Sequence, residues 1–112
     1  MTYEQWSVVV VPFPFTDRDS QMRRPAIVLS AQSDFGGPSG HSVLAMVTSA
    51  EHSSWPLDVV ISDLAAAGLS VPCVVRMKLF TRDNRFVLRQ VGSLAAGDRD
   101  AVREALDRLL GR

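Results

Sequence analysis

The chain has 112 residues, 46% of them hydrophobic, and its 12 lysines and arginines balance its 12 aspartates and glutamates. This length leaves no room for a second core, so we expect a single domain spanning residues 1–112. One cysteine and two histidines exclude an internal disulfide and a cysteine-rich metal centre, and no cofactor is expected. The N-terminus lacks a signal-peptide pattern and no apolar run approaches the roughly 20 residues of a membrane span, which favours a soluble cytoplasmic protein without membrane contacts.

Short apolar runs bounded by proline, glycine and polar residues predict a chain of β-strands. Four consecutive valines at 8–11 and the run Ala26-Ile27-Val28-Leu29 favour a pleated, buried environment. Prolines at 12, 14 and 25 mark where the first two runs end or begin, because proline is excluded from central strands. The expected strands cover residues 6–13, 25–30, 42–48, 57–61, 73–81 and 86–91.

The connections carry their own signals. Gly36-Gly37-Pro38-Ser39-Gly40 predicts a loop over 32–40 without regular structure. Ser62 or Asp63 can cap a single helical turn that Gly68 ends, and Asp83-Asn84 indicates a turn between the last two strands.

The C-terminus changes to a helical period. Apolar residues recur on one helical face at Ala101, Val102, Ala105, Leu106, Leu109 and Leu110. Asp98 and Asp100 suit the positive N-terminal end of this helix, although its first residues offer no strong side-chain cap. Many short strands followed by one amphipathic helix predict a β-dominated α+β fold, in which a small bent barrel of about six strands carries a C-terminal helix.

Positive charge is concentrated although the net charge is zero. No lysine or arginine occurs between Ala31 and Val75, and eleven of the twelve cations are arginine. Arginine suits bidentate phosphate contacts, and genome base composition is an equally good explanation of its excess. If the fold joins the two basic segments, they form one basic face. The segments are Arg18, Arg23 and Arg24, and Arg76, Lys78, Arg82, Arg85 and Arg89.

Five motifs, in order along nearly the whole chain, resemble the MazF/PemK-type toxins of bacterial toxin–antitoxin pairs. They are Val-Val-Pro-Phe-Pro-Phe-Thr-Asp at 10–17, Arg-Pro-Ala-Ile-Val-Leu-Ser at 24–30, Met-Val-Thr-Ser at 46–49, Pro-Cys-Val-Val-Arg at 72–76 with Lys-Leu-Phe-Thr-Arg-Asp at 78–83, and Val-Gly-Ser-Leu at 91–94 before the helix.

The resemblance implies an SH3-like (MazF/CcdB-type) barrel and a metal-independent, sequence-specific endoribonuclease acting on single-stranded RNA (mRNA). In that family the 2′-hydroxyl attacks the adjacent phosphate and leaves a 2′,3′-cyclic phosphate. Arg24 and Thr48 match the catalytic pair. The family is typically homodimeric, and a small cognate antitoxin silences it.

Residue chemistry supports part of this assignment. The guanidinium fork of Arg24 matches phosphate oxygens, but arginine side chains are poor proton carriers because their pKa exceeds about 12. A threonine hydroxyl can orient the phosphate or the attacking group by hydrogen bonding. The general base is open: Asp17 and Asp19 are the nearest carboxylates in the sequence, and the arginine itself is a further option.

The remaining candidates divide between the core and RNA binding. Phe13 and Cys73 are assigned to the core, and Phe15 to the loop. Trp55 fits two roles equally well, a surface on which an RNA base stacks or a residue of a protein interface. His41 and His52 are expected to be solvated bystanders. The RNA-binding candidates are Phe15, Thr16, Asp17, Arg18, Arg23, Ser49, Trp55, Arg76, Lys78 and Arg82.

Two other functions fit the same fold. A CcdB-like toxin binds DNA gyrase and cuts nothing, and an inactive relative would serve as a nucleic-acid or protein interaction module. The Arg-Pro strand and Thr48 favour the nuclease.

Overall fold

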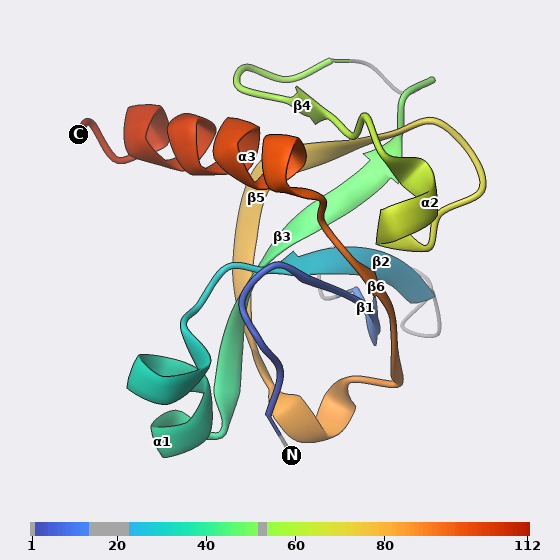
Figure 1. Ribbon diagram of the computed structural model, residues 1–112. Helices are drawn as coiled ribbons and strands as arrows, with labels where there is room; N and C mark the ends of the chain where they lie inside the picture. The colour runs from blue at the N-terminus through green and yellow to red at the C-terminus, as the bar shows by residue number, and fades with distance from the viewer. Residues whose placement is uncertain (1, 14–22, 52–53) are drawn as a thin grey trace.

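A single antiparallel sheet of six strands, in the order β4-β5-β3-β2-β1-β6, curls into a half-barrel (Figure 1). The computed structural model describes residues 2–51 and 54–112, except for 14–22. The strands are β1 (Ser7–Pro12), β2 (Arg23–Val28), β3 (His41–Ser49), β4 (Val59–Val60), β5 (Cys73–Asp83) and β6 (Arg89–Ser93). The helices are α1 (Gly37–Ser39), α2 (Leu64–Ala67) and α3 (Ala96–Leu109), with a π-helical turn η1 (Gln32–Gly36) and a 3-10 turn η2 (Asn84–Phe86).

The expected strands all form, with different ends. β4 has two residues instead of the predicted 57–61, because Leu57 has a φ of 68° and cannot begin an extended strand. β6 starts at Arg89 and not at 86, because the Asp83 side chain accepts a hydrogen bond from the Arg85 N–H and caps η2.

The prediction that residues 32–40 lack regular structure is wrong. η1 and α1 fill this segment, with Pro38 near the start of α1 and Gly40 ending it at a φ of 72°. Gly36 and Gly37 adopt ordinary right-handed helical angles, and proline is tolerated in the first turn of a helix. The glycines therefore permit the turn instead of breaking it.

Strand alternation places apolar side chains on both faces of the sheet. One cluster, which includes Val8, Ile27 and Val75, packs between the sheet and Val102 and Ala105 of α3. In Figure 1 α3 lies across the sheet on this side. A second cluster lies on the opposite face and includes Val9, Val11, Phe13, Ala26, Val28, Leu44 and Phe80. Phe13 and Cys73 are both buried, as expected.

Two helix ends form as the sequence predicts. Asp63 accepts a hydrogen bond from the Ala66 N–H, and Gly68 ends α2 in the left-handed region. α3 begins after Ala95 without a side-chain cap. Asp98 in its first turn is buried and accepts hydrogen bonds from the Ser62 and Asp63 N–H groups at 3.0 Å each, so the start of α3 fixes the start of α2.

Candidate functional site

Arg24 and Thr48 come together where β2 and β3 end their shared ladder. The last pair in that ladder joins Ala26 to Met46, and the same register continued by two residues sets Arg24 opposite Thr48. Residues opposite each other in an antiparallel pair project to the same side of the sheet, with Cβ atoms about 5 Å apart. Both residues line the same hollow, so the structure joins the two residues that the sequence singled out.

Two hollows meet at Arg24 and Pro25. The first, of about 290 Å³, we call the Thr48 hollow; its lining includes Thr48, Ser49 and Cys73. The second, of about 310 Å³, we call the Arg89 hollow. Arg23, Arg24 and Arg89 all line it, so one hollow is mainly neutral and the other carries three guanidinium groups.

The segment after α2 forms a wall common to both hollows. Gly68 and Leu69 line each of them. This wall lies directly on β6, since a Cβ added at Gly68 would come within 2.1 Å of the Val91 carbonyl oxygen. A Cβ at Gly92 would come within 2.5 Å of the Ala66 carbonyl oxygen. Glycine at both positions therefore allows α2 to lie directly against β6.

Cations and aromatic rings alternate on the sheet face that carries Arg24. The Arg24 guanidinium lies 5.8 Å from the centroid of Phe13, which belongs to the second core cluster. The even-numbered residues of β5 share that face, because Phe80 packs in the same cluster and Arg76 pairs with Met46. The predicted cations Arg76, Lys78 and Arg82 thus lie on the same side of the sheet as Arg24 and Thr48.

Arg76 is buried and ion-paired. Its side chain is 7% exposed, and it donates to both carboxylate oxygens of Asp58, at 3.2 Å from Nε and 3.0 Å from Nη2. Burial on its own would raise the pKa of Asp58, but hydrogen bonds from Arg76 and from the Trp55 N–H hold it below the ordinary 3.8. This pair makes Arg76 a structural cation as well as a candidate ligand.

Two aromatic rings lie beside the other β5 cations. Trp55 is 41% exposed, and its ring centroid lies 5.2 Å from the Arg76 guanidinium and 5.6 Å from the Lys78 Nζ. At the far end of the strand the Arg82 guanidinium lies 4.9 Å from the exposed ring of Phe86. Such contacts hold flat side chains against a strand.

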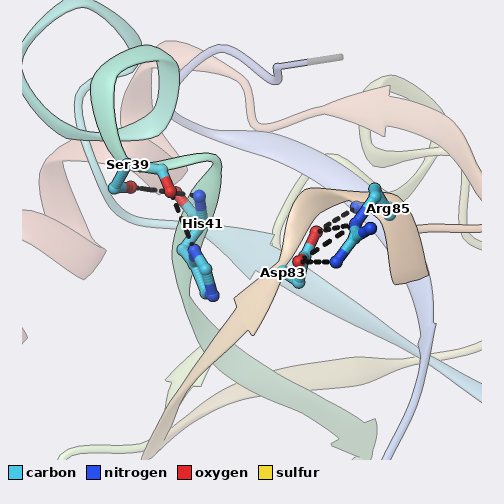
Figure 2. A network of polar contacts seen from close by, with 4 residues as sticks. All are labelled: Ser39, His41, Asp83 and Arg85. Atoms are coloured by element: carbon cyan, nitrogen blue, oxygen red, sulfur yellow. Dashed lines mark hydrogen bonds and ion pairs between the residues drawn. The ribbon is translucent and has the colours of Figure 1, made fainter.

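His41, which was predicted to be a solvated bystander, lies at the end of β3 opposite to Thr48. His41 begins that strand, roughly 23 Å from Thr48 at the usual rise per residue. Its Nδ1 lies 2.9 Å from the Ser39 carbonyl oxygen, and the neighbouring Asp83 carboxylate pairs with Arg85 at 2.8 Å (Figure 2). The Arg85 hydrogen bonds are the main reason that the pKa of Asp83 is lowered to about 2. His41 is partly exposed and remote from the Arg24 site.

Several predicted residues lie outside the described part of the chain. They are Phe15, Thr16, Asp17, Arg18, Asp19 and His52. Within the described residues no group of three histidine, cysteine, aspartate or glutamate side chains is placed to hold a metal ion. Burial raises the pKa of the Cys73 thiol, so this side chain stays protonated beside the Thr48 hollow.

Sequence reasoning missed three contributors to the site, Gly68, Leu69 and Asp58. It had placed Arg89 in the second basic segment, and Arg89 joins Arg23 and Arg24 because β6 pairs with β1, next to β2. Gly68 and Leu69 reach the site through the packing of α2 on β6. Asp58 is one of four acidic residues in the segment free of cations, and only the β4–β5 pairing reveals its partner.

Comparison with known proteins identifies solved structures with the same fold. No helix in the described residues has the length and apolar character needed to cross a membrane. No curated protein sequence matches the chain closely enough to count as a relative. Among solved structures, MazE-MazF (Form-III) from Deinococcus radiodurans is 25% identical with a TM-score of 0.78, covering 99% of this chain and 98% of that one.

Mycobacterial structures share the fold at lower identity. Mycobacterium tuberculosis toxin MazF-mt6 is 20% identical with a TM-score of 0.73, covering 94% of this chain and 96% of that one. An endoribonuclease in complex with its cognate antitoxin from a mycobacterial species is 14% identical with a TM-score of 0.73, covering 98% and 94% of the two chains. The family model described as PemK-like, MazF-like toxin of type II toxin-antitoxin system matches residues 4–110. The chain therefore belongs to the PemK/MazF toxin family of type II toxin–antitoxin systems.

Proposed function

We propose that this toxin is an endoribonuclease that cleaves single-stranded RNA at a phosphate bound between Arg24 and Thr48. The observation that carries the proposal is that these two residues face each other at the end of the β2–β3 ladder and line one hollow. Family membership adds support, because one solved structure of the same fold is an endoribonuclease.

The proposed reaction is a transesterification. The ribose 2′-oxygen bonds to the adjacent phosphorus while the bond from phosphorus to the 5′-oxygen breaks. The 2′-hydroxyl proton leaves to a base and the departing 5′-oxygen gains a proton, so the products are a 2′,3′-cyclic phosphate and a 5′-hydroxyl. No metal ion is needed for this balance, because the nucleophile belongs to the substrate.

Arg24 and Thr48 have separate roles in this scheme. Negative charge grows on the phosphate oxygens in the transition state, and a guanidinium held in place stabilises that charge. The Phe13 ring beside Arg24 limits the positions that its guanidinium can take. Thr48 is 2% exposed, so its hydroxyl has a fixed place from which to orient the phosphate or the 2′-hydroxyl.

The two hollows provide a path for the strand on either side of that phosphate. Arg23 and Arg89 would contact backbone phosphates in the Arg89 hollow, while Ser49 would contact a nucleotide in the Thr48 hollow. Lys78 and Arg82 would extend the contacts along β5, and Phe15, Thr16, Asp17 and Arg18 remain proposed ligands from the β1–β2 connection. Homodimerisation and control by a cognate antitoxin are part of the proposal, and solved relatives in complex with their antitoxins support the latter.

The test is cleavage of a long RNA by purified protein in the presence of EDTA, with the ends mapped by primer extension. We expect cuts at a short preferred sequence and a 5′-hydroxyl on the downstream product. Arg24→Ala should lower the cleavage rate by about 100-fold or more, as expected for loss of a transition-state charge partner. Arg112→Ala is the matched control, because Arg112 lies beyond the end of α3 and pairs with Asp107 of that helix.

Full activity of Arg24→Ala would overturn the assignment of the site. Intact RNA with wild-type protein, together with inhibition of DNA gyrase, would replace the nuclease with a binding toxin of the same fold.

A further inference from the structure

Trp55 is held in place by an ion pair that is largely shielded from solvent. The Asp58 carboxylate accepts from the Trp55 N–H at 3.0 Å and from Arg76 through both of its oxygens. The side chains of Arg76 and Asp58 are 7% and 13% exposed. One carboxylate therefore fixes both the backbone of Trp55 and the cation beneath its ring.

The Trp55 ring combines a fixed inner side with an open outer one. Arg76 and Lys78 are two residues apart on β5 and both lie within 6 Å of the ring centroid. A ring that lies over two side chains of one strand turns its other face away from that strand, and Trp55 is 41% exposed. Exposed tryptophan faces held without conformational freedom are efficient stacking surfaces for nucleobases.

The strand beneath the ring also runs past Thr48. Thr48 pairs with Val74, so Arg76 is its diagonal neighbour on the same face of the sheet, at roughly 7–8 Å. We therefore expect a base stacked on Trp55 to belong to a nucleotide near the one whose phosphate lies at Thr48.

We propose that Trp55 stacks an unpaired RNA base adjoining the scissile phosphate, and that Asp58 and Arg76 are positioning residues that fix its ring. The inference rests on the proposed function for the identity of the strand. It assigns Arg76 a role different from that of a phosphate ligand, since its charge is already matched by Asp58.

Electrostatics alone predicts the opposite effect of removing Asp58. Loss of a carboxylate beside two cations raises the local positive potential, so Asp58→Asn would strengthen binding of a polyanion if charge were the only factor. If Asp58 positions the ring, the same substitution weakens binding because the Trp55 N–H and Arg76 lose their charged partner. The direction of the change therefore separates the two explanations.

The experiment measures tryptophan fluorescence while a 2′-O-methyl RNA oligonucleotide, which lacks the attacking hydroxyl, is added to the full-length protein. We expect the oligonucleotide to quench wild-type fluorescence, and Trp55→Phe to lose the quench because the remaining Trp6 is buried. Asp58→Asn and Trp55→Ala should each weaken binding by about 5- to 150-fold, the range for loss of one stacked base. Asp100→Asn removes the same charge from the exposed surface of α3 and should leave binding unchanged within about twofold.

The outcomes separate this inference from the proposed function. If wild-type protein cleaves RNA but the oligonucleotide does not quench Trp55 fluorescence, or if Asp58→Asn binds more tightly, the stacking role of Trp55 is overturned and the nuclease assignment stands. If Trp55 fluorescence is quenched but no RNA is cleaved, the nuclease assignment is overturned and Trp55 remains a base-binding residue. Trp55→Ala changes a half-exposed side chain, so it carries the test if Asp58→Asn fails to fold.

Discussion

Gly68 lies so close to Val91 that a Cβ at Gly68 would be 2.1 Å from the Val91 carbonyl oxygen. The contact joins the end of α2 to β6 and sets the position of the wall shared by the Thr48 and Arg89 hollows. Because the nearest atoms belong to the backbone, a side chain at residue 68 can be accommodated only if α2 moves away from the sheet.

Gly68→Ala is therefore expected to lower both stability and activity. The left-handed φ of 72° costs a non-glycine residue about 1–2 kcal/mol, and the backbone clash adds to that cost. Gly40→Ala is the matched control, because Gly40 has the same φ of 72° and nothing within 4 Å of an added Cβ. Urea unfolding should show a larger loss of unfolding free energy for Gly68→Ala, and cleavage should fall only in that variant. Equal losses in the two variants would mean that the clash is relieved without cost.

Thr48→Val tests the hydroxyl separately from the shape of the side chain. Valine keeps the branched form in a site that is 2% exposed, so stability should change by about 1 kcal/mol, the usual scale of one hydrogen bond. The cleavage rate should fall by roughly 100-fold if the hydroxyl orients the reacting groups. Thr48→Ser, which keeps the hydroxyl, should retain most of the rate. Comparable cleavage by the valine and serine variants would remove Thr48 from the reaction.

The ionisation of Asp83 should make the stability of the protein depend on pH. Asp83 lies at the end of the β3–β5 pair that is remote from Thr48. Its pKa falls from the ordinary 3.8 to about 2, chiefly because of hydrogen bonds from Arg85. A carboxyl whose pKa is lower in the folded state stabilises the fold above pH 3.8, and this contribution is lost as the pH falls from about 4 to about 2.

NMR titration of the Asp83 carboxyl should locate this pKa, and thermal unfolding between pH 2 and 5 should show a smaller pH dependence in Asp83→Asn than in the wild type. Arg85→Gln should return the pKa of Asp83 towards 3.8. A titration midpoint near 3.8 in the wild type would show that the pair is not formed in solution.

The local sequence pattern correctly predicted the structure of segments whose conformation depends mainly on their own residues. The valine run lies in β1, Asp63 and Gly68 delimit α2, and the apolar period forms α3. The Ala-Ile-Val run lies in β2, but that strand begins at Arg23 and includes Pro25, which was expected to mark its start. The local pattern failed where backbone conformation depends on neighbours: the glycine-rich segment folds into helical turns, and Leu57 shortens β4 through its positive φ. Neither outcome is encoded in residue preference alone.

The sequence by itself determined the strands, the closing helix and the family, and it predicted Arg24 and Thr48 as a pair, because each depends on motifs a few residues long. Only the tertiary structure decided what surrounds that pair. Strand order brings Arg89 to Arg23, helix packing brings Gly68 to the wall of the hollows, and β4–β5 pairing brings Asp58 to Arg76. These contacts join residues far apart in the chain, and their energies depend on burial and distance that exist only once the sheet has curled.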